Sequence, residues 1–130
     1  MTRYPVVHFE MPYDDADRAA AFYSAAFGWG MNQFGPEMGN YVTAETSETK
    51  DGRPTEPGHI NGGLFPRDPE APGQHPSVVV GVDDIQAAVA RVNEAGGEVL
   101  GEPIDIPGVG LYVAFLDTEG NRASILQPVG

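Results

Sequence analysis

The same order of secondary-structure signals occurs twice along this chain. In each copy an apolar strand pattern, at residues 6–11 and 78–82, is followed by a helical pattern that ends at glycine and then by shorter extended segments. One such unit cannot cover the face of its own sheet, so two of them in 130 residues are expected to fold as one domain. The repeat predicts an α+β fold in which two βαβββ modules form a curved, eight-stranded mixed sheet around a central groove.

The first module is predicted to span about residues 4–65. Its first strand alternates polar and apolar residues, which puts His8 and Glu10 on the same face. The helix that follows has an apolar stripe over residues 16–27, and Gly28 is expected to end it in the left-handed conformation. Asp14 or Asp15 is expected to cap this helix, with further strands near 30–35, at 41–44 and at 60–65, and an exposed polar loop over 45–58.

The second module is predicted over residues 77–130, after a semi-rigid linker at 66–76 that is rich in proline. Asp83 or Asp84 is expected to cap its helix, and the glycine pair at 96–97 is expected to end it. Strands are expected at 98–100, 111–116 and 122–127, with a loop over 103–110.

The composition restricts the classes of function. Nineteen Asp and Glu residues against seven Lys and Arg residues give a formal net charge of −12. This charge disfavours nucleic acids and acidic membranes as partners and attracts cationic small molecules. The chain has no cysteine, which excludes disulfides and fits a reducing cytoplasm. Because no segment has the ~20 apolar residues of a membrane helix and no signal peptide is apparent, we expect a cytoplasmic protein.

Three motifs stand at set distances within the repeat: His8 followed by Phe22-Tyr23 and Gly28, the strand-to-helix run 80–85, and the turn 117–121 before the last strand. Together they resemble the vicinal oxygen chelate superfamily, which includes glyoxalase I, bleomycin-resistance proteins and extradiol dioxygenases. The resemblance covers almost the whole chain. Residues 7–12 and 60–64 are further similar to a group of small proteins related to lactoylglutathione lyase.

The resemblance implies a divalent metal site with one ligand from each of four strands. His8 falls on the first position, Asn61 lies near the second, and Ser77 falls on the third. Ser124 falls on the fourth, where metal-using members often carry glutamate. Serine hydroxyls are poor metal ligands compared with imidazole and carboxylate. We therefore expect no cofactor, and a divalent metal (Zn, Ni, Fe or Mn) is the alternative.

Two other histidines leave a displaced metal site open. The chain has three histidines, and His59 and His75 lie close in sequence to the second and third ligand positions. If both turned toward His8, three imidazoles could bind a metal ion. The competing interpretation is that His59 and His75 are solvated loop residues and that His8 faces the groove without a metal.

Glu10 is the candidate catalytic residue. A partly buried carboxylate beside a histidine has a tunable pKa, and it could act as a general base or hold a cationic ligand. A salt bridge or an exposed strand end is the alternative for Glu10. Gly62 and Gly63 could let a ligand approach the backbone, or they could form a β-bulge. The candidate ligand-binding residues are His8, Glu10, Trp29, Tyr41, Asn61, Ser77, Tyr112 and Ser124, with core packing as the alternative for the aromatic ones.

The predicted function is binding of a small molecule in the groove between the modules, without the usual four-ligand metal site. The alternative is a divalent-metal-dependent lyase or isomerase similar to glyoxalase I, which would use His8 with displaced ligands. Extradiol dioxygenation is disfavoured because Ser124 cannot supply the carboxylate that this chemistry requires. A metal-free enzyme that uses Glu10 and His8 as base and acid is a third hypothesis. The resemblance also implies a homodimer.

Overall fold

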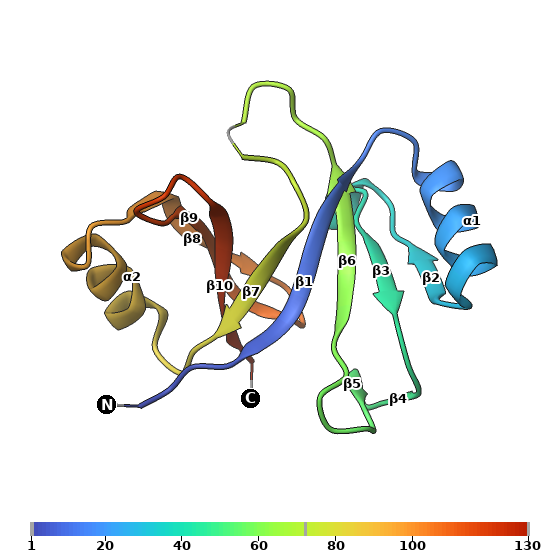
Figure 1. Cartoon of the computed structure of the whole chain (residues 1–130), viewed down its shortest axis with the longest axis horizontal. Helices are drawn as coiled ribbons and strands as arrows, with labels where there is room; N and C mark the ends of the chain where they lie inside the picture. Colours follow the sequence, from blue (N-terminus) through green and yellow to red (C-terminus); the bar gives the residue numbers. More distant parts are fainter. Residues whose placement is uncertain (1, 72, 130) are drawn as a thin grey trace. The chain divides into compact units, whose positions relative to one another are not determined.

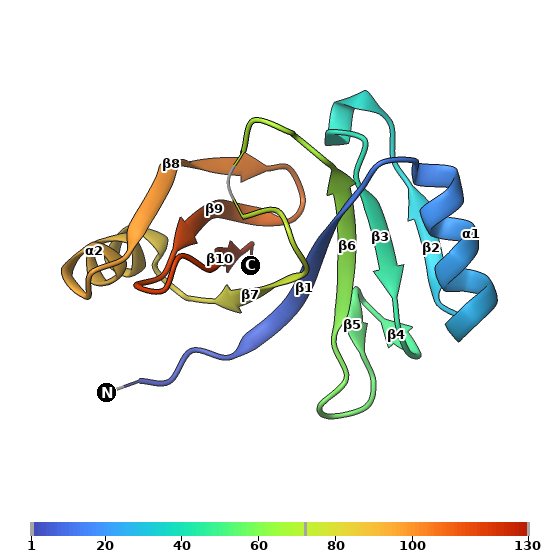
Figure 2. The same cartoon turned by 45° about the horizontal axis from the view of Figure 1, so that its top comes forward.

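The computed structural model describes residues 2–71 and 73–129. The chain divides into two compact units. One unit is formed by residues 8–76, and the other joins the N-terminal segment up to Val7 to the segment from Ser77 onward. Each unit contains one helix beside a set of strands (Figures 1 and 2).

The first unit contains most of β1 (Val6–Tyr13), whose first two residues are assigned to the other unit. Its further elements are α1 (Ala16–Phe27), β2 (Gly30–Gln33), a 3-10 turn (Pro36–Met38), β3 (Val42–Glu45), β4 (Thr49–Lys50), β5 (Arg53–Pro54) and β6 (Asn61–Pro66). The order of the sheet strands is β2-β3-β6-β1. β1 and β6 are parallel, whereas β6–β3 and β3–β2 are antiparallel. Parallel strands cannot be joined by a tight hairpin and need a longer crossover connection. The elements between β1 and β6 provide this connection.

The segment 45–58, predicted as a loop, contains the small hairpin β4–β5. Asp51 and Gly52 form its turn, with φ angles of 54° and 78°. Two successive residues with positive φ are typical of a type I′ turn, for which Asp-Gly is a favoured pair. The prediction of a loop over the whole of residues 45–58 is therefore wrong at this hairpin.

The first helix begins and ends as its sequence predicts. Asp15, rather than Asp14, is the cap, because its carboxylate accepts a hydrogen bond of 3.0 Å from the backbone N–H of Arg18. Gly28 ends the helix with φ 72°, and its N–H donates to the carbonyl of Ser24. This left-handed conformation carries no steric cost for glycine.

The elements of the second unit are β7 (Ser77–Gly81), α2 (Ile85–Glu94), β8 (Glu98–Ile106), β9 (Gly110–Leu116) and β10 (Arg122–Pro128). The strand order is β7-β10-β9-β8, with β7 and β10 parallel and the other pairs antiparallel. Asp84 caps α2 through the N–H of Ala87. The helix and the four sheet strands follow one another in the same order as in the first unit. This confirms the predicted α+β class with two βαβββ modules.

Strand β8 is longer than predicted. It reaches Ile106, whereas the sequence predicted a loop from residue 103. The register against β9 shifts between Leu100 and Ile104, so the segment with Pro103 forms an irregularity within the strand. β8 is an edge strand, because it ends the strand order β7-β10-β9-β8. Edge strands tolerate proline and bulges because their outer backbone groups are not paired.

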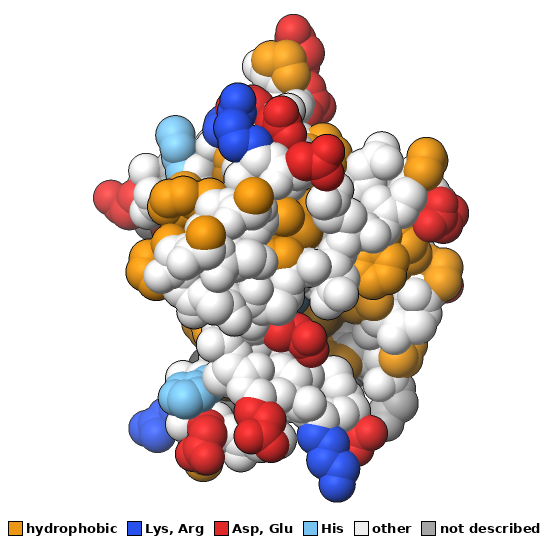
Figure 3. Space-filling model, turned by 90° about the vertical axis from the view of Figure 1, so that its right-hand side faces the viewer, with side chains coloured by type: hydrophobic (Ala, Val, Ile, Leu, Met, Phe, Trp, Pro, Cys, Tyr) orange, Lys and Arg blue, Asp and Glu red, His pale blue; other side chains and the backbone are white. Residues whose placement is uncertain are grey.

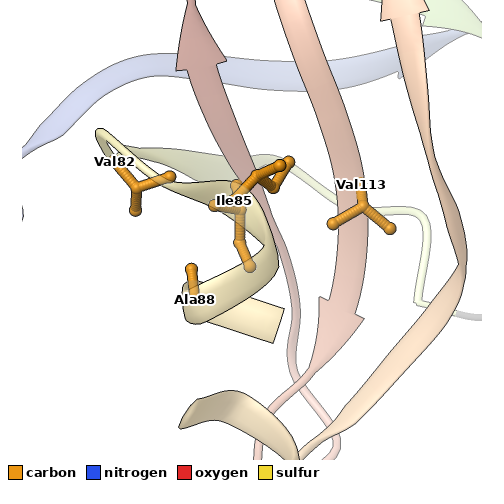
Figure 4. Packing of buried hydrophobic residues seen from close by; sticks show 5 residues of the cluster. Val82, Ile85, Ala88 and Val113 are labelled. Carbon is orange, nitrogen blue, oxygen red and sulfur yellow. The ribbon is translucent and has the colours of Figure 1, made fainter. Parts of the chain in front are cut away.

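The core of the second unit lies between α2 and its strands. Val82, Ile85, Ala88, Val113 and Ile125 are all buried, and Ile85 is only 1% exposed. Figure 4 shows Ile85 between Val82 and Val113, and Ala88 below Val82 on the next turn of α2. Helix α2 is thus held by apolar burial, the main stabilising term in a fold of this size.

The core of the first unit is smaller and lies in the strands. Val42, Ala44 and Leu64 are buried, whereas α1 has no buried residue. The side chains packed against this core are Phe9, Met11, Tyr13, Ala16, Ala19, Tyr23, Trp29 and Met31. In the described residues, neither helix is long and apolar enough to cross a membrane.

Candidate ligand-binding site

The first unit gathers three polar side chains on one face of its sheet. In the parallel ladder, His8 pairs with Asn61 and Glu10 pairs with Gly63. Alternate residues of a strand point to opposite faces, so His8 and Glu10 share the face opposite Phe9. Tyr41 precedes β3 and joins this face through its hydroxyl group.

The Tyr41 hydroxyl connects His8 to Glu10. It donates a hydrogen bond of 2.9 Å to Oε2 of Glu10, and it lies 3.0 Å from Nε2 of His8. A phenol has one proton, and here Glu10 receives it, so the phenol oxygen accepts from Nε2–H of His8. This arrangement assigns the Nε2–H tautomer to a neutral His8.

Burial supports the neutral state of His8. Removal of the ring from water lowers the pKa of His8 from 6.5 to about 4, because the charged imidazolium loses its hydration. Glu10 is only 7% exposed, which is unusual for a glutamate. A buried carboxylate is costly unless it accepts hydrogen bonds, and the Tyr41 phenol supplies one.

Two glycines of β6 make room for aromatic rings. A Cβ atom at Gly63 would overlap the Tyr41 hydroxyl group, and one at Gly62 would overlap the ring of Phe9. The register between β1 and β6 continues without a shift through both glycines. The β-bulge explanation is therefore wrong, and the close approach at Gly63 is made by Tyr41 of the chain itself.

The side chain of Asn61 forms hydrogen bonds with the neighbouring segment after β3. Its side-chain oxygen accepts from the N–H of Thr46 at 2.9 Å, and its amide group donates to the hydroxyl of Thr49 at 2.9 Å. The side chain thus fastens the segment between β3 and β4 to the start of β6. This role occupies both ends of the amide that was predicted to bind a ligand.

Trp29 lies on the other face of the same sheet. Its ring stacks on Tyr23 with centroids 4.8 Å apart and approaches Phe9 at 5.6 Å. Phe9 points away from the face that carries His8 and Glu10. The structure therefore does not bring Trp29 together with the other predicted site residues of this unit.

The second unit contains the remaining predicted residues. Ser124 is 2% exposed, and its hydroxyl lies 2.7 Å from the hydroxyl of Tyr112 on the neighbouring strand β9. Ser77 begins β7 and is half-buried. Ser124 and Tyr112 thus form a neutral hydroxyl pair in the interior.

Neither unit gathers a metal-binding cluster of its own among the described residues. Within each unit, no three His, Cys, Asp or Glu side chains of the described segments come together in a way that could hold a metal ion. His59 and His75 are exposed residues of connecting segments, and they do not gather with His8. The donors that do lie together, His8 and Glu10, are bridged by the Tyr41 phenol.

The sequence interpretation missed that Gly63 and Tyr41 depend on each other. The sequence does contain a sign of this contact, the glycine pair at the centre of the predicted strand 60–65. Glycine at such a place often indicates that another group closely approaches the backbone. The identity of that group came only from the sheet register, since Tyr41 is 22 residues away in the sequence.

The profile of the Glyoxalase/Bleomycin resistance protein/Dioxygenase superfamily matches residues 6–125. The chain therefore belongs to this superfamily, as its motifs predicted. It is 34% identical over 124 residues to a glyoxylase-like domain-containing protein of Didymella fabae, covering 93% of this chain and 91% of that protein.

Two bacterial relatives are longer. The putative glyoxylase CFP32 of Mycobacterium tuberculosis is 33% identical over 120 residues, which cover 92% of this chain and 42% of CFP32. The anthracycline biosynthesis protein DnrV of Streptomyces peucetius is 30% identical over 125 residues, which cover 86% of this chain and 42% of DnrV. The chain thus spans less than half the length of these two relatives.

Solved structures of methylmalonyl-CoA epimerase have the same fold. One of them matches with a TM-score of 0.71 and 20% identity, covering 100% of this chain and 99% of that chain. The epimerase from Mycobacterium tuberculosis matches with a TM-score of 0.68 and 15% identity, covering 96% of this chain and 88% of that chain. At these identities the similarity concerns the fold alone.

Proposed function

We propose that this protein binds a small organic molecule at the sheet face that carries His8, Tyr41 and Glu10, without the metal site typical of the superfamily. The observation that carries this proposal is the buried hydrogen-bonded chain from His8 through Tyr41 to Glu10. A buried carboxylate adds little to stability compared with apolar packing, so its presence favours a role in recognition.

The chemistry of this face favours a ligand that donates hydrogen bonds. Glu10 is an acceptor, and a hydroxyl or ammonium group of a ligand is the partner that suits it. The net charge of −12 also concentrates cations near the surface. We therefore propose a ligand with a hydroxyl or amino group on an apolar or aromatic body.

The donor set does not favour the alternative of a glyoxalase I-like metal enzyme. His8 donates its Nε2–H to Tyr41, and Glu10 accepts from the same phenol. A metal ion at this place would have to displace Tyr41 from both residues and find further ligands. At the fourth ligand position, Ser124 is engaged with Tyr112.

The names of the relatives suggest which compounds to test first. CFP32 is described as a putative glyoxylase, and DnrV as an anthracycline biosynthesis protein. An anthracycline such as daunorubicin combines an aromatic body with hydroxyl and amino groups, and its own fluorescence reports binding. The hemithioacetal of methylglyoxal and glutathione represents the glyoxalase class.

The test is a titration of the purified protein with both compounds in the presence of a chelator. We expect saturable binding of daunorubicin and a tenfold to hundredfold weaker affinity for Glu10→Gln, because a hydrogen bond to a charged group is worth about 1.5–3 kcal/mol. Glu94→Gln is the matched control. It removes the same charge from an exposed position at the end of α2 and should leave the affinity unchanged.

Three outcomes would contradict the proposal. Binding that needs added Zn, Ni, Fe or Mn would favour the metal-dependent lyase. Equal weakening by Glu10→Gln and Glu94→Gln would show that only the overall charge attracts the ligand. If no compound of a panel of aromatic amines and hydroxyketones binds, the proposed class of ligand, with a hydroxyl or amino group on an apolar or aromatic body, is wrong.

The same face also suits proton transfer, with Glu10 as the catalytic base. The observation in favour is the buried carboxylate bonded to a phenol, because a phenol can pass a proton to or from such a group. The measurement is exchange of a carbon-bound hydrogen next to a ligand carbonyl group in deuterium oxide. Exchange that persists in Glu10→Gln would contradict this role.

A further inference from the structure

A hollow lies between helix α1 and the end of β1 in the first unit. Its volume is about 310 Å³, at the low end of the ~300–1,000 Å³ typical of small-molecule pockets. Met11 alternates with His8 and Glu10 along β1, so the hollow lies on the opposite face of this strand. We call it the α1–β1 hollow, and its apolar lining includes Met11, Ala19, Phe22, Tyr23 and Leu64.

An exposed aromatic ring stands at the α1–β1 hollow. Phe22 lines the hollow and is 57% exposed. Its ring meets the ring of Tyr23 edge-on, with centroids 5.0 Å apart and an angle of 84° between the planes. Figure 3, which views the side of the molecule with α1, shows hydrophobic side chains at the surface across the middle of the face. The two rings give a ligand with an aromatic group an apolar surface on which to pack.

The hydroxyl of Tyr23 is a hydrogen-bond donor with a poor partner. It donates to the sulfur of Met11 at 3.2 Å, and both residues line the hollow. No other hydrogen bond joins this hydroxyl to the described residues. A thioether sulfur is a weak acceptor. An oxygen atom of a ligand is a better partner for this hydroxyl, and a carboxylate oxygen is the best.

The charged groups of the hollow also favour an anion. Of its two carboxylates, Asp14 accepts a hydrogen bond of 2.9 Å from Nε of Arg67. Asp15 caps α1 and accepts from the backbone N–H of Arg18 at 3.0 Å. The guanidinium group of Arg18, which also lines the hollow, forms no ion pair or hydrogen bond with the described residues. The hollow therefore offers a ligand two donors, Arg18 and the Tyr23 hydroxyl.

We propose that the α1–β1 hollow is a second binding site, which takes a small aromatic carboxylate. The ring of the ligand packs against Phe22 and Tyr23, and its carboxylate accepts hydrogen bonds from Arg18 and the Tyr23 hydroxyl. Arg18 and Phe22 are four residues apart on α1, which makes them neighbours on the helix surface. The proposal does not depend on the ligand of the face with Glu10, which calls for a donor instead of an anion.

The first test uses 3-phenylpropionate, titrated into the full chain labelled with ¹⁵N and followed by NMR. Physiological ionic strength screens the repulsion by the net charge of −12. We expect saturable shifts of the amide signals of Arg18 and Phe22 and of the indole N–H signal of Trp29. Trp29 is the single tryptophan, and its ring stacks on Tyr23 with centroids 4.8 Å apart, so it reports on the hollow.

The neutral analogue 3-phenylpropanamide separates the charge from the ring. It should bind about fivefold more weakly, because it lacks the ion pair with the exposed Arg18. Equal affinities of the two compounds would contradict the role of the charge. Shifts confined to the strand residues around His8, or no saturable shift with any of a panel of aromatic carboxylates, would overturn the proposal.

Two variants locate the carboxylate. Arg18→Gln should weaken binding of 3-phenylpropionate about fivefold, and Arg18 is exposed, so the fold should be retained. Tyr23→Phe keeps the ring, removes the hydroxyl and should have a similar effect. Arg53→Gln is the matched control, because it removes the same charge from an exposed position on β5. Equal weakening by Arg18→Gln and Arg53→Gln, or unchanged affinity in both Arg18→Gln and Tyr23→Phe, would overturn the proposal.

Discussion

The two modules have the same order of elements, yet they use their helices differently. Helix α2 buries Ile85 and Ala88 against its strands, whereas α1 buries no residue completely and leaves Phe22 and Phe27 exposed. A repeated architecture therefore does not imply a repeated role for its helices. In the second module the helix completes the core, and in the first it leaves two aromatic side chains exposed.

The modules also differ in the polar groups that they bury. In each module a tyrosine hydroxyl bonds to a buried polar side chain, Tyr41 to Glu10 in the first and Tyr112 to Ser124 in the second. The first pair contains an ionisable group and adjoins His8, whereas the second pair is neutral. Of these two buried pairs, only that of the first module therefore contains a carboxylate.

The largest expected effect concerns the helices. Ile85→Ala should lower the free energy of unfolding by about 2–5 kcal/mol, because it leaves a cavity at a fully buried site. Phe22→Ala should change it by less than about 1 kcal/mol in dilute protein, because the ring is mostly exposed. Urea denaturation of both variants measures the difference. Similar losses would contradict the contrast between α1 and α2.

The second expected effect is a loss of stability in acid that depends on His8. The unfolded chain binds a proton at His8 near pH 6.5, whereas the folded chain binds it only near pH 4. Stability should therefore fall as the pH decreases from 6.5 to 4, by at most about 3 kcal/mol. Denaturation curves at several pH values should show a shallower fall for His8→Gln than for the wild type. His59→Gln, at an exposed position, is the control. An unchanged slope in His8→Gln would contradict the buried neutral imidazole.

The third effect concerns Gly63. Gly63→Ala should lower stability by about 1–3 kcal/mol and weaken ligand binding, because the new Cβ atom would displace Tyr41. Gly30→Ala, in β2 of the same sheet, is the matched control, since its Cβ atom would meet its nearest neighbour at 3.4 Å. Thermal unfolding and the daunorubicin titration measure the two effects. Equal results for the two alanine variants would show that Tyr41 does not need the space above Gly63.

Much of this fold could be predicted from the sequence. The strand alternation, the capping aspartates and Gly28 placed the helices and the first strand close to their observed limits, because these signals are local. The extension of β8 was missed because Pro103 resembled a strand end, and only the pairing with β9 reveals the bulge that accommodates it. The contrast between α1 and α2 was also missed, since both have helical apolar stripes and only packing shows which stripe is covered.

The candidate site could be predicted in part. His8 and Glu10 were placed on one face by their spacing, which the ladder to β6 preserves. The bridge through Tyr41 could not be predicted, because it depends on the register of two strands with a long segment between them. Trp29 was a candidate ligand-binding residue with core packing as the alternative, and its actual neighbours are Tyr23 and Phe9 on the opposite face.

The central claim, that a ligand binds at His8, Tyr41 and Glu10 without a metal, can be tested most directly by NMR of protein labelled with ¹⁵N at histidine. The chain has three histidines, and only His8 lies at the proposed site. In the presence of a chelator, addition of ligand should shift the ring nitrogen signals of His8 and leave those of His59 and His75 in place. Shifts confined to His59 or His75, or shifts of His8 that appear only after a divalent metal is added, would contradict the claim.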